Sequence, residues 1–139
     1  MTKIEITIDG QRFVADLLTD EAPKTCDAFL KCLPIQTDMY HSAWSGDSIW
    51  FMLTPDKAPI TPPHENASIY GARGEIMWHA TEKYHEFQLV HGCAQFRWKE
   101  GPLVSNIFAR IGGDLKAFDQ LSRRIQKEGG KTVRIQAVQ

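Results

Sequence analysis

One short segment of the sequence brings together side chains that could bind a flat ligand. In an extended chain Tyr40, Ser42 and Trp44 share one face, because successive side chains alternate. His41 lies on the opposite face, and Trp50 follows across a short turn, where cross-strand contact is expected. Two tryptophans beside an imidazole can form one wall of a pocket. The alternative is that they are core aromatic residues packed under a helix.

Glu65 lies at the end of a proline-rich loop over residues 54–66, and prolines restrict the path of such a loop. A carboxyl group held beside apolar rings can have a raised pKa and serve as a general acid or base. We therefore predict Glu65 as the catalytic acid or base, with His41 or His85 assisting proton transfer. The alternative is a solvated carboxylate on a surface loop.

Further residues are candidates for contact with a substrate. Trp78 would add a third wall to the pocket or pack in the core, and Glu86 would face the pocket or lie at its rim. Arg110 shares a strand face with Asn106. Its guanidinium could bind a substrate carboxylate through two parallel hydrogen bonds, or it could face solvent. The predicted substrate-binding residues are Trp44, Trp50, Trp78, Glu86, Asn106 and Arg110.

The histidines do not show the spacing of a metal site. His85 and His91 lie roughly 20 Å apart in an extended strand, so they cannot share a metal by themselves. His79 could approach His85 across a hairpin, but no Cys or His spacing resembles a zinc site. The serines around His41 follow no Ser-His-Asp order, and no glycine-rich phosphate loop is recognisable. We expect neither a metal nor a cofactor.

The charge balance and the apolar runs exclude several classes of protein. The 139 residues include 16 basic and 17 acidic side chains, a net charge of −1, whereas nucleic-acid binders usually carry a basic excess. The apolar runs are far shorter than the ~20 residues that span a bilayer, and the first residues alternate in polarity, unlike a signal peptide. We therefore expect one cytoplasmic domain over residues 1–139, with no nucleic-acid or membrane partner.

Hydrophobic periodicity predicts eight or nine short strands. Apolar residues alternate strictly over residues 3–9, and the Asp9-Gly10 pair favours a tight hairpin turn. The other predicted strands cover residues 11–18, 38–44, 48–53, 75–80, 86–91, 94–98, 106–111 and 132–138. Closing such a sheet removes its exposed edges, so we predict a mainly β fold, a closed or nearly closed eight-stranded β-barrel.

Two amphipathic helices would cover this barrel. The first begins near Pro23, carries an apolar stripe at helical spacing and ends at Pro34. The second follows Asp114 as its N-cap and ends at Gly129-Gly130. One helix comes after the second strand and the other before the last.

This order of elements, with Pro23-Lys24-Thr25 and an aromatic-bearing helix after the first hairpin, resembles the cyclophilins. Tyr40-His41 falls where a cyclophilin has Phe-His-Arg, but Ser42 stands in place of the arginine that prolyl isomerisation requires. The resemblance therefore implies the fold without the prolyl isomerase activity.

A closer resemblance is to the DUF3830 family of small bacterial proteins with a cyclophilin-like fold. Its most specific matches are Trp44-Ser45-Gly46 and Glu65-Asn66, and further similar stretches cover residues 41–50, 71–76, 86–92 and 101–109. A neighbouring branch of the fold resembles cucumopine synthase, an opine-forming cyclase. The resemblance thus implies that such a barrel can host carbon–nitrogen chemistry on small molecules.

Residues and resemblance together predict a small-molecule-binding protein or enzyme. We expect cofactor-independent acid/base chemistry, such as isomerisation, elimination, ring opening or cyclisation. The expected substrate is a small polar amino-acid-derived carboxylate or a cyclic amide. The alternative is a non-catalytic ligand-binding module, or a homo-oligomer in which exposed aromatic residues form the subunit interface.

Overall fold

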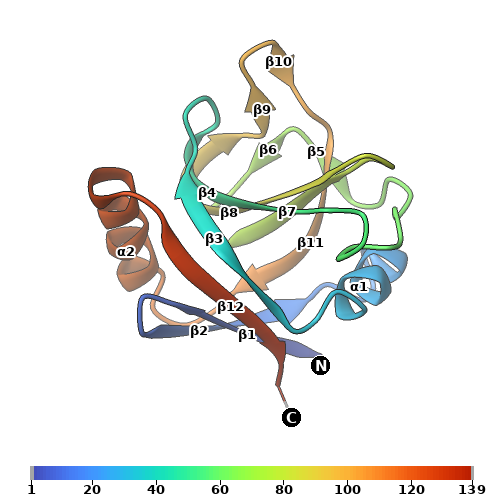
Figure 1. Ribbon diagram of the computed structural model, residues 1–139, viewed down its shortest axis with the longest axis horizontal. Coiled ribbons are helices and arrows are strands. Elements are labelled where there is room, and N and C mark those ends of the chain that lie inside the picture. The colour runs from blue at the N-terminus through green and yellow to red at the C-terminus, as the bar shows by residue number, and fades with distance from the viewer. Residues whose placement is uncertain (1, 139) are drawn as a thin grey trace.

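Eight antiparallel strands close into a barrel in the computed structural model, which describes residues 2–138 (Figure 1). Around the barrel the order is β2, β1, β12, β3, β4, β8, β7 and β11, and pairing of β11 with β2 closes the sheet. The bounds are β1 (Lys3–Ile8), β2 (Gln11–Leu17), β3 (Ile35–His41), β4 (Gly46–Leu53), β7 (Glu75–Ala80), β8 (His85–Gln95), β11 (Ser105–Ile111) and β12 (Lys131–Ala137). Shorter strands are β5 (Ala67–Ser68), β6 (Tyr70–Gly71), β9 (Arg97–Trp98) and β10 (Gly101–Pro102). The predicted mainly β, closed eight-stranded barrel is confirmed.

The first hairpin forms as the sequence predicts. Ile4, Ile6 and Ile8 on β1 are fully buried, while the residues between them are partly exposed. Asp9 and Gly10 both have positive φ, 49° and 79°, the left-handed conformations that a tight type I′ turn requires.

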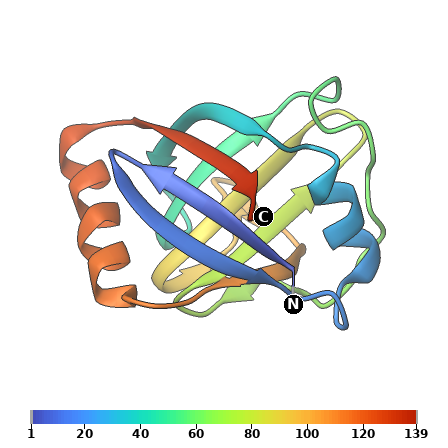
Figure 2. The same cartoon turned by 90° about the horizontal axis from the view of Figure 1, so that it is seen from below.

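The two helices cover opposite ends of the barrel (Figure 2). α1 (Pro23–Leu30) and α2 (Leu115–Glu128) each contribute buried residues to the core, and Asp114 caps α2 by accepting a hydrogen bond from the Ala117 N–H at 2.9 Å. α1 ends earlier than predicted. The N–H groups of Cys32 and Leu33 bond to carbonyls three residues back, the tighter pattern of a helix end. Within residues 2–138, neither helix is long and apolar enough to cross a membrane.

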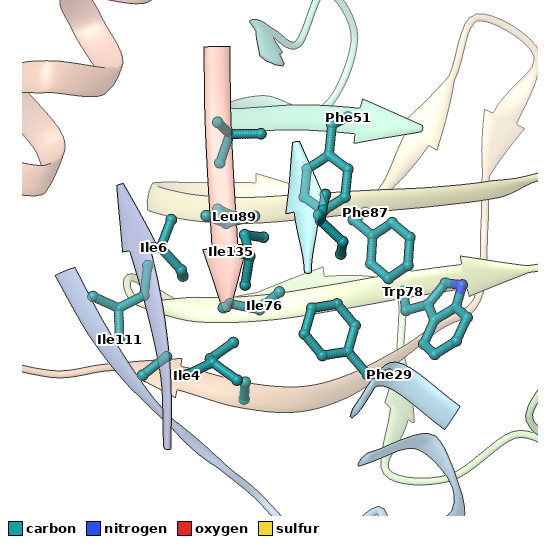
Figure 3. Packing of buried hydrophobic residues seen from close by; sticks show 14 of the residues in the cluster. Ile4, Ile6, Phe29, Phe51, Ile76, Trp78, Phe87, Leu89, Ile111 and Ile135 are labelled. Atoms are coloured by element: carbon teal, nitrogen blue, oxygen red, sulfur yellow. The ribbon is translucent and has the colours of Figure 1, made fainter. Parts of the chain in front are cut away.

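The core has an aliphatic part and an aromatic part (Figure 3). Isoleucines and a leucine fill one side of the barrel, and aromatic rings fill the side near α1. The Phe87 ring centroid lies 4.8 Å from those of Phe51 and Trp78 and 5.6 Å from that of Phe29. We call Phe29, Phe51, Trp78, Phe87 and Phe108, all at most 1% exposed, the inner aromatic cluster.

One long strand, β8, joins a predicted strand to the start of the next, and the end of the second predicted strand is the separate β9. The predicted strands over residues 86–91 and 94–98 were separated at Gly92, whereas β8 continues through this residue. A Cβ on Gly92 would lie 2.3 Å from Asp47 Oδ2, and this carboxylate accepts a hydrogen bond from the Cys93 N–H at 3.2 Å. The glycine therefore makes room for a neighbouring side chain instead of forming a turn. β3 also ends at His41, so Trp44 lies in the turn between β3 and β4.

Candidate functional site

A pocket of about 650 Å³ opens on the outer face of the barrel beside β3, β4 and β8. Side chains alternate along β4, so Phe51 enters the core while Trp50 and Met52 point outward. The β3–β4 turn and the β9–β10 hairpin project at the same end of the barrel and supply further walls (Figure 1). The pocket is lined by Tyr40, His41, Ser42, Ala43, Trp44, Ser45, Trp50, Met52, Tyr84, Glu86, Gln88, Arg97 and Trp98. We call these lining residues the outer aromatic pocket.

Aromatic rings form the walls of this pocket. Tyr40 and Trp50 are cross-strand partners, and their ring centroids lie 5.6 Å apart. Trp44 from the β3–β4 turn is 56% exposed, and Trp98 from the β9–β10 hairpin is 43% exposed. Rings that stay exposed on a sheet scaffold offer stacking surface to a flat ligand.

A hydrogen-bonded floor beneath the rings is centred on the buried side chain of Gln88. Its Oε1 accepts from Ser48 Oγ at 2.9 Å, and its Nε2 donates to Ser45 Oγ at 3.0 Å. The same Nε2 donates to Glu86 Oε2 at 2.9 Å. Ser45 Oγ also donates to the Arg97 carbonyl and accepts from the Arg97 N–H, and these bonds anchor the β9–β10 hairpin to the β3–β4 turn. This floor fixes the orientation of the Glu86 carboxyl group.

Two charged groups of the pocket keep free binding capacity. Burial raises the pKa of Glu86, although the hydrogen bond from Gln88 acts in the opposite direction. The second oxygen, Oε1, receives no hydrogen bond from residues 2–138. The Arg97 guanidinium bonds to the Gln95 side chain and the Trp98 carbonyl, and it pairs with no carboxylate in the described part of the chain. The pocket thus offers a carboxyl group and a cation to a ligand.

A chain of hydrogen bonds links α2 to the ring of His41, which lies on the face of β3 opposite Tyr40. His41 Nε2 lies 2.9 Å from His91 Nε2, and His91 Nδ1 lies 2.7 Å from Asp119 Oδ1. His91 is fully buried, and burial lowers its pKa although the hydrogen bond to Asp119 opposes this. Desolvation acts to raise the pKa of Asp119, but hydrogen bonds from His91 and Arg123 outweigh it and lower the pKa. Within residues 2–138 no three His, Cys, Asp or Glu side chains are grouped as metal ligands.

The structure brings together four of the predicted site residues, His41, Trp44, Trp50 and Glu86, in the outer aromatic pocket. Trp78 is not a wall of this pocket: it faces the inside of the barrel from β7 and is 1% exposed. Its indole Nε1 donates to His85 Nδ1 at 3.1 Å, so both buried polar groups have a partner. Arg110 is exposed on β11 and pairs with Glu75 at 3.3 Å.

Glu65 and Asn106 lie at the N-terminus of α1 and do not line the pocket. Glu65 Oε1 accepts from the N–H and the hydroxyl of Thr25, each at 2.7 Å, and Oε2 accepts from the Lys24 N–H at 3.3 Å. Desolvation opposes these hydrogen bonds, yet they lower the pKa of Glu65. Asn106 accepts from the Glu65 N–H at 3.1 Å and donates to the Pro63 carbonyl at 2.8 Å. This arrangement suits a helix cap.

Sequence reasoning missed several residues that the structure places at the pocket or its hydrogen-bond chain. Alternation over residues 86–90 puts Gln88 on the same face as Glu86, so a signal for Gln88 was available. Trp98 enters from a hairpin and Asp119 from a distant helix, and no local pattern links either to His41. The missed residues are Tyr84, Gln88, Arg97, Trp98, His91 and Asp119.

Solved structures with the same fold come from varied proteins. The structure of McbB in complex with tryptophan matches with a TM-score of 0.73 and 15% identity, covering 96% of this chain but 44% of McbB. A hypothetical protein from Archaeoglobus fulgidus matches with a TM-score of 0.61 and 16% identity, covering 97% of this chain and 93% of that one. A cyclophilin-type peptidyl-prolyl cis-trans isomerase from Cryptosporidium parvum, in the presence of the dipeptide Ala-Pro, has a TM-score of 0.56, 11% identity and 99% coverage of both chains. These similarities show the cyclophilin-like fold, and the chain spans less than half the length of McbB.

The family match covers nearly the whole chain. No curated protein matches the sequence. The family model described as "Protein of unknown function (DUF3830)" matches residues 4–137. This result confirms the resemblance that Trp44-Ser45-Gly46 and Glu65-Asn66 carry in the sequence. The chain therefore belongs to the DUF3830 family.

Proposed function

We propose that the outer aromatic pocket binds a small molecule with a flat ring and a carboxylate, and that Glu86 exchanges a proton with it. The observation that carries this proposal is a cavity of about 650 Å³ in which exposed rings surround a carboxyl group, one oxygen of which receives no hydrogen bond from residues 2–138. The rings supply stacking area, and the Arg97 guanidinium can pair with a carboxylate. Amino-acid-derived carboxylates and cyclic amides of amino-acid origin fit this combination.

Glu86 suits the role of general acid or base. Its raised pKa brings the carboxyl group closer to neutral pH, where an acid/base catalyst works best. Gln88 holds Oε2 and leaves Oε1 for a ligand. A carboxyl group placed in this way supports isomerisation, elimination, ring opening or cyclisation, each of which needs a proton to be removed or delivered.

Binding is tested first, with L-tryptophan, the molecule in the McbB complex, and a set of small carboxylates, lactams and hydantoins. We expect a saturable change in tryptophan fluorescence and a rise in Tm, both lost in Trp98→Ala. Tyr70→Ala is the matched control, because Tyr70 is 63% exposed and lies outside the pocket lining. Binding that survives Trp98→Ala, or that Tyr70→Ala removes equally, would contradict the proposal.

Proton transfer is tested on any molecule that binds. In D2O, exchange of a carbon-bound proton of the ligand is followed by NMR for the wild type and for Glu86→Gln. We expect exchange in the wild type and none in Glu86→Gln, with the affinity largely retained. Equal exchange in both proteins would remove Glu86 from the reaction.

A second candidate function is contact between copies of the chain. Tyr40, Trp44, Met52 and Trp98 are each at least 43% exposed and gather around one pocket. Light scattering separates the two functions. A dimer that dissociates in Trp44→Ala, with no ligand found, favours assembly, whereas a monomer excludes it.

A further inference from the structure

The floor of the outer aromatic pocket contains hydroxyl and amide groups whose hydrogen bonds have only one possible direction. The hydroxyl of Ser45 lies 2.9 Å from the Arg97 carbonyl, which can only accept, so the single proton of Ser45 is donated there. In its contact with Gln88 at 3.0 Å, Ser45 Oγ must therefore accept. The atom of Gln88 that faces it is then the amide nitrogen, which also donates to Glu86 Oε2 at 2.9 Å. The orientation of the Gln88 amide is thus determined.

The oriented amide of Gln88 sets the direction of the remaining bonds. Its Oε1 lies 2.9 Å from Ser48 Oγ and can only accept, so it takes the hydroxyl proton of Ser48. Ser48 Oγ then has no proton left for Ser42 Oγ, which lies 2.7 Å away, and Ser42 must be the donor in this contact. Ser48 and Gln88 are at most 1% exposed, so solvent does not replace either partner.

Ser42 lies on the pocket side of the sheet. Its N–H bonds to the Ser48 carbonyl at 2.9 Å, which extends the pairing of Tyr40 with Trp50 by two residues along β3 and β4. Alternation then places the Ser42 side chain on the same outer face as Tyr40, and Ser42 is only partly buried and lines the pocket. Within residues 2–138 its Oγ has no hydrogen-bond partner other than Ser48. Because its proton is donated to Ser48, the Ser42 oxygen faces a ligand only as an acceptor.

We propose that Ser42 selects ligands whose flat ring presents an N–H group, and that Ser48 and Gln88 are positioning residues that fix its hydroxyl as an acceptor. Indoles, lactams and hydantoins carry such a group, whereas ring ethers of the same shape do not. A ring without the donor covers the Ser42 oxygen and leaves it unpaired, which weakens binding. The selection of the ligand rests on the proposed function, whereas the direction of the hydroxyl does not.

The direction of the Ser42 hydroxyl is measured by neutron diffraction from crystals of the deuterated protein grown without ligand. We expect the deuteron on Ser42 Oγ to point to Ser48 Oγ, and the deuteron of Ser48 to point to Gln88. The two deuterons on Gln88 Nε2 should point to Ser45 and to Glu86. A Ser42 deuteron that points into the pocket overturns the proposal, whatever ligand the pocket binds.

Ligand selection is measured with two flat carboxylates of the same shape. Indole-3-acetate has a ring N–H, and benzofuran-3-acetate has a ring oxygen in its place. We expect the wild type to bind indole-3-acetate roughly three- to tenfold more tightly, which is the effect of one hydrogen bond. Ser42→Ala should remove this difference by weakening indole-3-acetate alone, whereas Ser42→Thr, which keeps the hydroxyl, should preserve it. Ser68→Ala is the matched control, because Ser68 lies on β5 outside the pocket lining.

The outcomes separate this inference from the proposed function. If Ser42→Ala weakens both probes equally, or if the preference for indole-3-acetate survives in this variant, the selection by Ser42 is wrong. The proposed function still stands in that case, provided that Trp98→Ala abolishes binding of both probes. If neither probe binds the wild type, the selection and the proposed function are both overturned.

Discussion

The inner aromatic cluster and the outer aromatic pocket use the same kinds of side chain in opposite ways. Inside the barrel the rings touch one another, with centroids 4.8 to 6.3 Å apart. The indole N–H of Trp78 and the ring nitrogen of His85 form a hydrogen bond with each other. Outside, Trp44 and Trp98 remain about half exposed, and one oxygen of Glu86 has no hydrogen-bond partner among the described residues. A binding site is therefore identified by ring surfaces that stay exposed and by charged groups that lack a protein partner. Aromatic or histidine content alone does not distinguish a binding site from a core.

The largest effect is expected where the rings fill space. Phe87 is fully buried and touches four other rings, so Phe87→Ala should lower the free energy of unfolding by about 3–5 kcal/mol through lost burial and an unfilled cavity. Trp98→Ala in the outer pocket should change it by less than about 0.5 kcal/mol. Urea unfolding measures both. Similar losses of stability in the two variants would show that the inner cluster and the outer pocket contribute equally to the stability of the fold, contrary to this prediction.

A smaller loss is expected at the cap of α1. Glu65→Gln keeps the shape of the side chain but removes the charge that three N–H and O–H donors face. We expect a loss of about 1 kcal/mol in the free energy of unfolding, because a helix N-terminus favours a negative charge and a full cap. Ligand binding in the outer pocket should not change. Loss of binding without loss of stability would return Glu65 to the site.

The pH dependence of unfolding separates the regions further. Burial lowers the pKa of His85 below its ordinary value of 6.5, and burial acts in the same way on His91. The unfolded chain then takes up the protons more readily, so the stability is complete above about pH 6.5 and falls as the pH drops toward the folded-state pKa. In His85→Gln the amide oxygen can still accept a hydrogen bond from Trp78. The free energy of unfolding of this variant, measured with urea at several pH values, should fall less steeply as the pH drops. An unchanged slope would exclude His85 as a source of this dependence.

The local patterns in the sequence were sufficient for the barrel. Alternation of apolar residues, the Asp9-Gly10 turn and the Asp114 cap each depend on residues a few positions apart, and all three have the predicted structure. The error at Gly92 arose because a glycine that makes room for Asp47 looks the same in sequence as a glycine in a turn.

The candidate site was harder to predict because its residues meet only after folding. His41, Trp44 and Trp50 lie close together in the chain, and this proximity sufficed to group them. The roles of the glutamates depend on partners far along the chain: Glu65 meets Thr25, and Glu86 meets the floor around Gln88. Composition and spacing do not contain that information.

A small stability effect, with the opposite sign to that of Glu65→Gln, is expected for Glu86→Gln. The folded-state pKa of Glu86 is raised by burial above its ordinary value of 4.5, so its carboxylate destabilises the fold as the pH rises through the folded-state pKa, and this cost vanishes below about pH 4.5. At neutral pH we therefore expect Glu86→Gln to be as stable as the wild type or more stable, by less than about 1 kcal/mol, and to match it in acid. Urea unfolding of both variants at the two pH values makes the comparison. A loss of stability as large as that of Glu65→Gln would mean that Glu86 stabilises the barrel as Glu65 stabilises α1. A gain would mean that the fold retains an unfavourable charge, as expected of a group that serves binding or catalysis.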